Sequence, residues 1–302
     1  MTSILTNVAA MAALQTLRGI SNNLQDTQNR VSSGYRVEKA ADNAAYWSIA
    51  TTMRSDNKAL SAVSDALGLG AAKVDTAYTA MDNAIDVVSE IKSKIVAATE
   101  KGVDKTKIQE EISQLQAQLM SISQSASFSG ENWVAGNSTK SVVSTFVRDG
   151  NGNVSVKTTD YVLDAASNGN VLFGMTTTGI IDASTGIIGT SNGTIGSIYT
   201  MNITSFGQPE IAMALTAIEA GLEAMTKAAS QLGSISNRIE LQENFVAALG
   251  DSIDSGVGRL VDADMEEESS RLTALQTQQQ LAIQSLSIAN SSAQNVLTLF
   301  RS

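Results

Sequence analysis

The stretch LTALQTQQQLAIQSLSIANSSAQNVLTLF, residues 272–300, decides the fold of this chain. Steps of three and then four residues along it reach a set of side chains in which only Gln279 is polar. The set is Leu272, Leu275, Gln279, Ala282, Leu286, Ala289, Ala293, Val296 and Phe300. This heptad spacing is typical of a helix that packs along its length against another helix.

A matching stripe lies near the start of the chain, and its only polar member is Thr27. Its positions are Ala10, Ala13, Leu17, Ile20, Leu24, Thr27 and Val31. The two stripes can pair with each other, with other copies of the chain, or with both. Small side chains bury little apolar area, and each Å2 contributes only roughly 25 cal/mol of stability. A lone pair of such helices is therefore only marginally stable. We therefore interpret the stripes as self-assembly surfaces.

Three further helical stripes predict a bundle. The first contains Val74, Ala77, Met81, Ala84, Val88, Ile91, Ile95 and Ala98, in a helix expected over 71–99 that ends before a C-cap glycine at Gly102. The second follows Asp104 with Ile108, Ile112, Leu115, Leu119 and Ile122. The third starts at Pro209 with Leu215, Ile218, Leu222, Met225, Ala229 and Leu232. A break is expected at Gly256 and Gly258, before the acidic first turn of the terminal helix.

The composition changes over residues 130–208, which hold 12 of the 22 glycines. Apolar and polar residues alternate in two runs, Val143–Val147 and Val154–Thr158, on either side of the turn Asp149–Gly152. This pattern predicts a β-hairpin. Further short strands are expected around Tyr161–Phe173, Gly179–Ile188 and Thr194–Thr204.

The predicted fold is mainly α, a bundle of long helices with coiled-coil terminal helices and an inserted small β domain. Three domains follow from this division. Residues 1–40 with 260–302 form the terminal coiled-coil core, 41–130 with 209–259 form the helical bundle, and 131–208 form a variable β outer domain.

Composition excludes several classes of function. The chain has no Cys and no His, which removes thiol nucleophiles, histidine bases and Cys/His zinc sites. Its formal net charge of −10 disfavours nucleic-acid binding and anionic membrane surfaces, and no apolar run is long enough for membrane insertion. We expect no enzyme activity, no cofactor and no metal. No basic residue precedes Arg18, so an uncleaved helix rather than a signal peptide is expected at the start.

Two motifs resemble those of the bacterial flagellin family. The first is Arg30-Val-Ser-Ser-Gly34-Tyr-Arg36, followed by Ala40, Asp42-Asn-Ala44-Ala45 and Ile49-Ala50. The second is Ala289-Asn290, followed by Gln294-Asn295-Val296-Leu297, Leu299 and Arg301. The run Asn43–Trp47 is similar to flagellins of rhizobium-like bacteria. The resemblance covers about residues 1–130 and 209–302.

The resemblance implies an extracellular, secreted subunit that polymerises into the flagellar filament for swimming motility, after type III export. Its implied partners are other flagellin subunits, an export chaperone, and cap and junction proteins. The expected assembly residues are Ala10, Ala13, Leu17, Ile20, Leu24, Val31, Leu272, Leu275, Leu286, Ala289, Val296 and Phe300. The terminal stripes are expected to fold as subunits dock.

The family also suggests a stretch that innate immune receptors of animals detect, which corresponds to Ser89–Ala97. In it Glu90 stands where the family has Arg, Lys94 stands where it has Leu, and Lys92 lies between them. The plant-receptor stretch corresponds to Asn29–Ala50 and departs at Glu38, Tyr46 and Trp47. Recognition by either kind of receptor is therefore expected to be weak or absent.

Two alternatives to a filament subunit remain open. A hook–filament junction protein shares flagellin-like ends but does not polymerise indefinitely. A secreted adhesin would use the β domain for a ligand and its ends for a closed oligomer. Open-ended growth separates the filament subunit from both.

Overall fold

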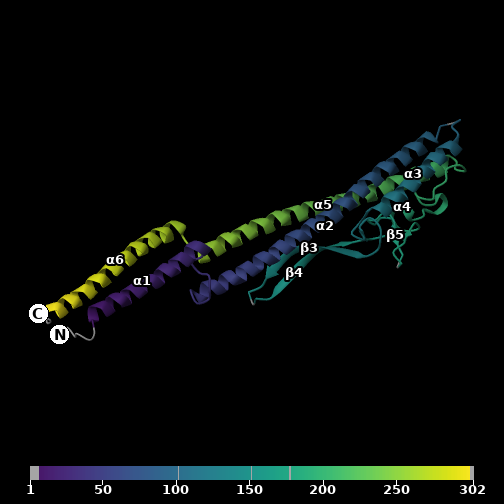
Figure 1. Ribbon diagram of the computed structural model, residues 1–302. Coiled ribbons are helices and arrows are strands. Elements are labelled where there is room, and N and C mark those ends of the chain that lie inside the picture. The colour runs from purple at the N-terminus through teal and green to yellow at the C-terminus, as the bar shows by residue number, and fades with distance from the viewer. Residues whose placement is uncertain (1–6, 101, 151, 177, 300–302) are drawn as a thin grey trace. The chain divides into compact units, whose positions relative to one another are not determined.

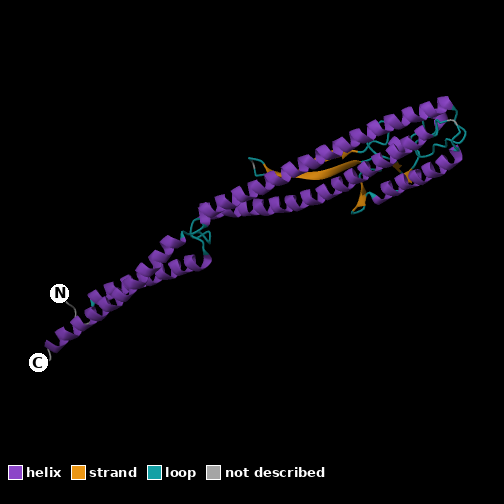
Figure 2. Cartoon of the chain, turned by 90° about the horizontal axis from the view of Figure 1, so that it is seen from above, coloured by secondary structure: helices purple, strands orange, loops and turns teal. Residues whose placement is uncertain are grey.

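The computed structural model describes residues 7–299 except Lys101, Asn151 and Thr177, with side chains described as far as Ser291. It is dominated by helices, and its strands are short or confined to one hairpin (Figure 2). The predicted mainly α fold with long helices and a small β insertion is confirmed. The chain divides into two compact units, residues 1–57 with 251–302 and residues 58–250.

The first unit contains α1 (Val8–Ser33) and α6 (Met265–Leu299), which lie side by side (Figure 1). Asn7 caps α1 by accepting a hydrogen bond from the amide of Ala10, and Gly34 ends the helix with φ of 76°. Asp264 caps α6 by accepting bonds from the amides of Glu266 and Glu267. The acidic first turn of this helix was predicted and is present.

Two connectors in the first unit, residues 34–43 after α1 and residues 262–264 before α6, are linked by hydrogen bonds. The amides of Arg36 and Val37 donate to the carbonyl of Val261 at 2.7 and 3.1 Å, and the amide of Ala263 donates to Gly34 at 2.9 Å. Beside them, Val37 packs in a small apolar cluster. The cluster contains Val37, Ala50, Met53, Ile253, Val257, Leu260 and Val261. These bonds hold the segment that follows α1 against the segment that precedes α6.

The second unit is built on the long helices α2 (Ala44–Ala97) and α5 (Gln208–Val261), both of which continue into the first unit. Within the second unit they run antiparallel, because Asp75 of α2 accepts a bond from Ser236 of α5 at 3.0 Å while Lys92 pairs with Glu219. The predicted stripe on α2 is buried throughout, with Val74, Met81 and Val88 fully inaccessible. Helix α3 (Lys105–Ser125) begins after Asp104, as predicted, and adds Ile112 and Leu119 to this core.

The predicted break at Gly256 and Gly258 is wrong, because α5 continues through both residues to Val261. A Cβ at Gly256 would lie 3.3 Å from Cε of Met53, so this glycine allows a close approach of α5 to α2. A Cβ at Gly258 would lie 2.8 Å from Oδ2 of Asp262. The chain turns instead at 262–264. Helix α2 is likewise longer than the predicted 71–99, since it begins at Ala44.

The described residues of the β insertion form three two-stranded antiparallel sheets. Their strands are β1 (Ser127–Phe128), β2 (Glu131–Asn132), β3 (Thr139–Arg148), β4 (Val154–Val162), β5 (Gly174–Met175) and β6 (Ile181–Asp182). The hairpin β3–β4 was predicted. The register pairs Phe146 with Val156 and Arg148 with Val154, and it shifts between Val143 and Thr145. Its turn is closed by Gly152, with φ of 85°.

The further strands predicted around Tyr161–Phe173, Gly179–Ile188 and Thr194–Thr204 are mostly absent from the described residues. Instead the chain forms turns and two short helices, α4 (Gly186–Gly189) and η1 (Gly193–Ile195). Polar side chains there accept hydrogen bonds from nearby backbone amides. Asp182 accepts from the amide of Ser184 at 2.9 Å, and Asn202 accepts from the amide of Thr204 at 3.0 Å. Such local bonds compete with a strand ladder.

Candidate functional site

The two terminal stripes face each other across the α1–α6 interface. In α1, all seven stripe positions from Ala10 to Val31 are partly or fully buried, whereas the residues between them are mostly exposed. In α6, the stripe positions Leu272, Leu275, Gln279, Ala282, Leu286 and Ala289 are the non-exposed positions between Ser269 and Ser291. The heptad pattern therefore located the contacting face of each helix.

The helices run antiparallel, and polar contacts mark both ends of the pair. Near one end, the side-chain amide of Asn7 donates to the carbonyl of Ala289 at 2.9 Å. Near the other, Arg30 Nη1 lies 3.1 Å from Glu268 Oε1. Burial is deepest next to the connectors, where Thr27 is 3 % and Leu275 is 8 % exposed. The side chain of Val296 and the whole of Phe300, two of the expected assembly residues, lie outside the described part of the chain.

The outward faces of this pair carry apolar side chains that lie outside the two stripes. On α1, Val8, Met11 and Leu14 recur at intervals of three residues and are 67, 58 and 38 % exposed. On α6, Leu281 and Ile288 lie two turns apart and are 59 and 68 % exposed, and Ile283 is also exposed. An apolar residue away from the strongest stripe of an amphipathic helix is the sequence signal that could have found them.

The same surface is nearly free of charge. No Asp, Glu, Lys or Arg occurs between Leu272 and Leu299, and Arg18 is the only charged residue between Val8 and Gln25. The exposed polar positions are amides and hydroxyls, and the chain as a whole carries −10. This part of the pair is thus a surface that like-charged copies can approach with little repulsion.

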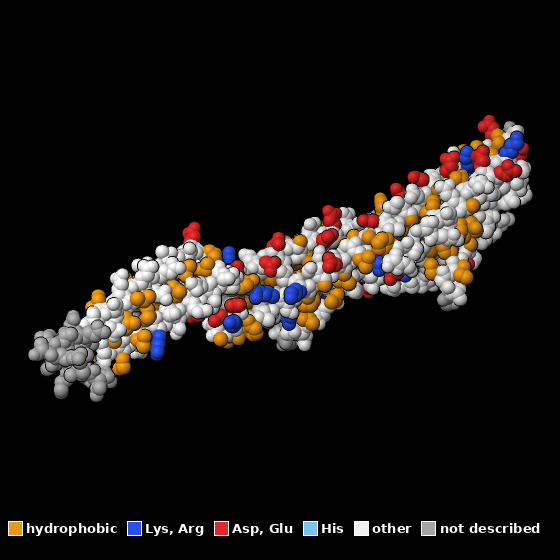
Figure 3. Space-filling model, in the orientation of Figure 1, with side chains coloured by type: hydrophobic (Ala, Val, Ile, Leu, Met, Phe, Trp, Pro, Cys, Tyr) orange, Lys and Arg blue, Asp and Glu red, His pale blue; other side chains and the backbone are white. Residues whose placement is uncertain are grey.

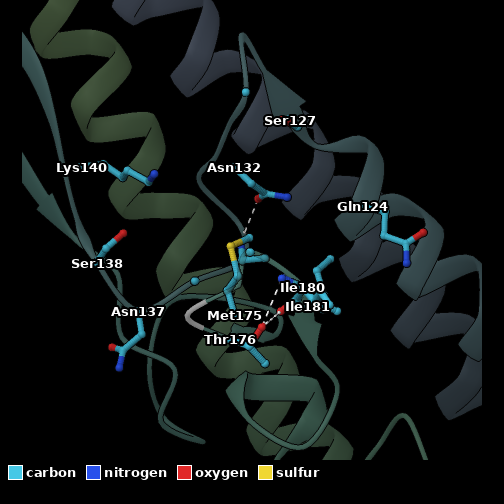
Figure 4. A pocket seen from close by; sticks show the side chains of 14 residues that line it. Gln124, Ser127, Asn132, Asn137, Ser138, Lys140, Met175, Thr176, Ile180 and Ile181 are labelled. Carbon is cyan, nitrogen blue, oxygen red and sulfur yellow. Dashed lines mark hydrogen bonds between the residues drawn. The ribbon is translucent and has the colours of Figure 1, made fainter.

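A second candidate is a cavity of about 720 Å3 in the unit of residues 58–250, between α3, β3 and the β5–β6 turn (Figure 4). Lys140 is the single charged residue in its lining. Asn132 is already bonded to the amides of Val134 and Ala135, and Thr176 to Ile180. These polar groups hold the loops in place. The described lining residues include no carboxylate.

The charged residues of the candidate receptor stretch are held in ion pairs. Lys94 Nζ lies 2.8 Å from Glu111 of α3 and 3.4 Å from Glu90, and Lys92 pairs with Glu219 of α5. The hydrogen bond and charge of Glu111, followed by those of Glu90, raise the pKa of Lys94 above its usual value. Both lysines therefore serve contacts within the bundle.

Metal and membrane sites find no support in the described residues. No group of three or more His, Cys, Asp or Glu side chains among them is arranged to hold a metal ion. No helix in the part of the chain that the structure describes is both long and apolar enough to cross a bilayer.

Comparison with known proteins places this architecture in a family. Residues 4–139 match the bacterial flagellin N-terminal helical region, and residues 215–300 match the bacterial flagellin C-terminal helical region. The chain belongs to the bacterial flagellin family. It is a structural protein rather than an enzyme, a subunit of the extracellular flagellar filament, as the resemblance implied.

The similarity to individual flagellins extends over whole chains. Flagellin C of Rhizobium meliloti (strain 1021) is 55% identical over 324 residues, and flagellin B of Rhizobium meliloti is 50% identical over 398 residues. A flagellin of Brucella melitensis biotype 1 is 44% identical over 307 residues. Each comparison covers 100% of both chains. The two family regions leave residues 140–214 unmatched, a range that includes all of the hairpin except Thr139.

Proposed function

We propose that the α1–α6 pair is the element through which subunits polymerise, with its two faces in different roles. The stripe residues from Ala10 to Val31 and from Leu272 to Ala289 hold the pair together. The outward apolar residues, represented by Met11 and Ile288, then pack against neighbouring copies. The observation that carries this proposal is the nearly uncharged, partly apolar outer surface of the pair over residues 8–25 and 272–291, in a chain of net charge −10.

The contact between copies is of the heterologous kind, in which one patch meets a different patch on the next subunit. Such a contact does not close on itself and produces an open helical polymer. The helices bury few large side chains as an isolated pair, so we propose that they become fully ordered as subunits dock. Residues 1–40 with 260–302 then form the polymer core, 41–130 with 209–259 the next layer, and 131–208 the outer, variable part.

Seeded assembly of matched α6 variants tests the division between the two faces. Leu286→Asp places a charge inside the pair and should unfold it, whereas Ile288→Asp places the same charge on its outside. Both variants should fail to extend filament seeds, but only Leu286→Asp should show less helical circular dichroism than the unmodified chain in the free monomer. Normal elongation by Ile288→Asp would contradict the role of the outer face. Phe300 and Val296 extend the stripe in sequence and are proposed to act with it.

Open-ended growth separates a filament subunit from a hook–filament junction protein. We propose growth in proportion to added monomer, with export, cap and junction proteins as further partners. We also propose weak or absent recognition by innate immune receptors, because Glu90 reverses a charge and Lys92 and Lys94 are engaged in ion pairs. Full receptor activation at ordinary flagellin doses would overturn the last point.

A further inference from the structure

The β3–β4 hairpin has two faces of unequal character. Cross-strand partners in an antiparallel pair share a face, and alternate residues occupy opposite faces. The face that includes Val142 and Tyr161 lies toward the helices, since these residues are 4 and 6 % exposed. A Cβ at Gly70 of α2 would lie 2.2 Å from Cγ1 of Val142, so the inward face is in direct contact with this helix.

The outward face is the more apolar of the two. It carries Val154, Val156 and Val162, which are 54, 55 and 61 % exposed. Phe146, the cross-strand partner of Val156, lies on the same face. The register shift after Val143 places that valine opposite Thr158, on the same face as Phe146 and Val156. A hairpin that lies on a core normally turns polar residues to solvent. Hydrophobic side chains are visible at the surface where β3 and β4 lie (Figure 3).

We infer that this outward face, defined by Val143, Phe146, Val154, Val156 and Val162, is covered by a second copy of this chain in the filament. The inference rests on the proposed polymerisation and assigns it a second contact, outside the terminal helices. The face contains one residue of each charge, Arg148 and Asp160, on a chain of net charge −10. A neutral apolar surface is the kind that a like-charged copy can cover without repulsion.

The neighbouring copy supplies a different patch, because a hairpin packed on another hairpin would close a two-fold dimer and end growth. On α5, Leu241 and Phe245 lie one helical turn apart and are 71 and 56 % exposed. They form an apolar ridge that fits against a flat two-stranded face. The hairpin face of one subunit therefore packs on the Leu241–Phe245 ridge of the next.

The contact is too small to hold two free subunits together. Stable interfaces bury at least roughly 1,000 Å2, more than the five side chains of the hairpin face and the two of the ridge provide. In a polymer held by the terminal helices, however, the same contact is repeated at high effective concentration. The hairpin face should thus be exposed to solvent in the monomer and covered by the next subunit in the filament.

Single thiols test this directly, because the chain has no Cys. Val156→Cys reports on the outward face and Ser155→Cys, the adjacent exposed residue on the opposite face, is the matched control. Each variant is copolymerised with an excess of unmodified subunits and treated with a small maleimide. From monomer to filament, labelling should slow at least tenfold for Val156→Cys and less than twofold for Ser155→Cys. Phe245→Cys should be protected like Val156→Cys.

The possible failures are distinguishable. If unmodified subunits form no filaments, the proposed function itself fails. If filaments form but Val156→Cys reacts as in the monomer, or both hairpin thiols are protected equally, the outward face is not the contact. If Val156→Cys alone is protected and Phe245→Cys stays reactive, the assigned partner ridge is wrong.

A functional measurement accompanies the labelling. The double change Val154→Thr and Val156→Thr keeps β-branched side chains but makes the face polar. It should raise the critical concentration for assembly at least fivefold with an unchanged monomer melting temperature. Val147→Thr, the same change on the opposite face, should leave the critical concentration unaltered. Equal effects of the two changes would overturn the inference.

Discussion

Arg30 on α1 and Glu268 on α6 join the two terminal helices beside the connectors, with Nη1 and Oε1 3.1 Å apart. The glutamate side chain is 8 % exposed and the arginine 36 %. Oε2 of Glu268 is buried and has no hydrogen-bond partner among the described residues. Such a pair fixes the register of the helices more than it stabilises them, because desolvation offsets much of the attraction.

Breaking this pair from one side should be more costly than removing it altogether. Arg30→Met leaves a buried carboxylate unpaired, and after allowance for the partial exposure of Arg30 we expect a loss of about 1–3 kcal/mol. Arg30→Met combined with Glu268→Leu should recover most of that loss. The thermal disassembly temperature of filaments measures both effects. A double variant as unstable as the single one would contradict this view of the pair.

Two glycines on α2, one in contact with the hairpin and one not, should respond differently to substitution by alanine. Gly70→Ala should destabilise the unit of residues 58–250 by about 1–3 kcal/mol, because its Cβ would lie 2.2 Å from Val142. Gly68→Ala meets nothing within 4 Å and should stabilise the helix by up to about 1 kcal/mol. Urea denaturation of the monomer measures both. An equal loss of stability in Gly68→Ala and Gly70→Ala would show that the contact with Val142 is not what distinguishes the two sites.

Tyr161 predicts a loss of stability at alkaline pH. Its ring stacks on Trp133 with centroids 6.0 Å apart, and burial raises the pKa of the phenol to about 12. A folded pKa above the unfolded value of 10.0 means that stability is complete below about pH 10 and is lost as pH rises toward 12. The linked free energy is about 2–3 kcal/mol.

Tyr161→Phe provides the control for this titration. The phenol oxygen of Tyr161 is buried without a hydrogen-bond partner, so its removal should cost little at neutral pH. Between about pH 9 and pH 11.5 the variant should lose less stability in urea than the unmodified chain. Parallel losses in the two proteins would show that Tyr161 is not responsible.

Salt should promote assembly. Subunits of net charge −10 repel one another, and the screening length falls from about 30 Å at 0.01 M to about 8 Å at 0.15 M salt. Elongation of seeds should therefore accelerate over this range, measured as filament length against time. Slower growth on adding salt would indicate that attractive ion pairs between subunits dominate instead.

Periodicity predicted the helical half of the fold well because burial follows it. The stripe from Val74 to Ala98 is buried throughout, and the terminal stripes meet along their whole described length. Gly256 does not interrupt its helix as glycine often does, because it allows close packing against Met53. Between Tyr161 and Thr204, polar side chains that bind their own backbone replaced most of the strands that alternation suggested.

The sequence predicted the inner face of the α1–α6 pair but not its outer apolar face. A heptad pattern identifies the face on which two helices meet, and that face was found within one chain. Residues such as Met11 and Ile288 belong to no stripe, and their exposure becomes apparent only once the partner helix is in place. In the hairpin, the register shift between Val143 and Thr145 moves Val143 to the opposite face from Val147, which alternation alone does not reveal.

The most direct test of the central claim is electron microscopy of monomer incubated with short filament seeds. The full chain is compared with residues 34–264, which lack α1 and α6 but retain the paired connectors. Long filaments from the full chain alone, with the truncated chain folded and monomeric, are the predicted result. Filaments from both, or discrete particles from the full chain, would contradict the assignment of polymerisation to the terminal helix pair.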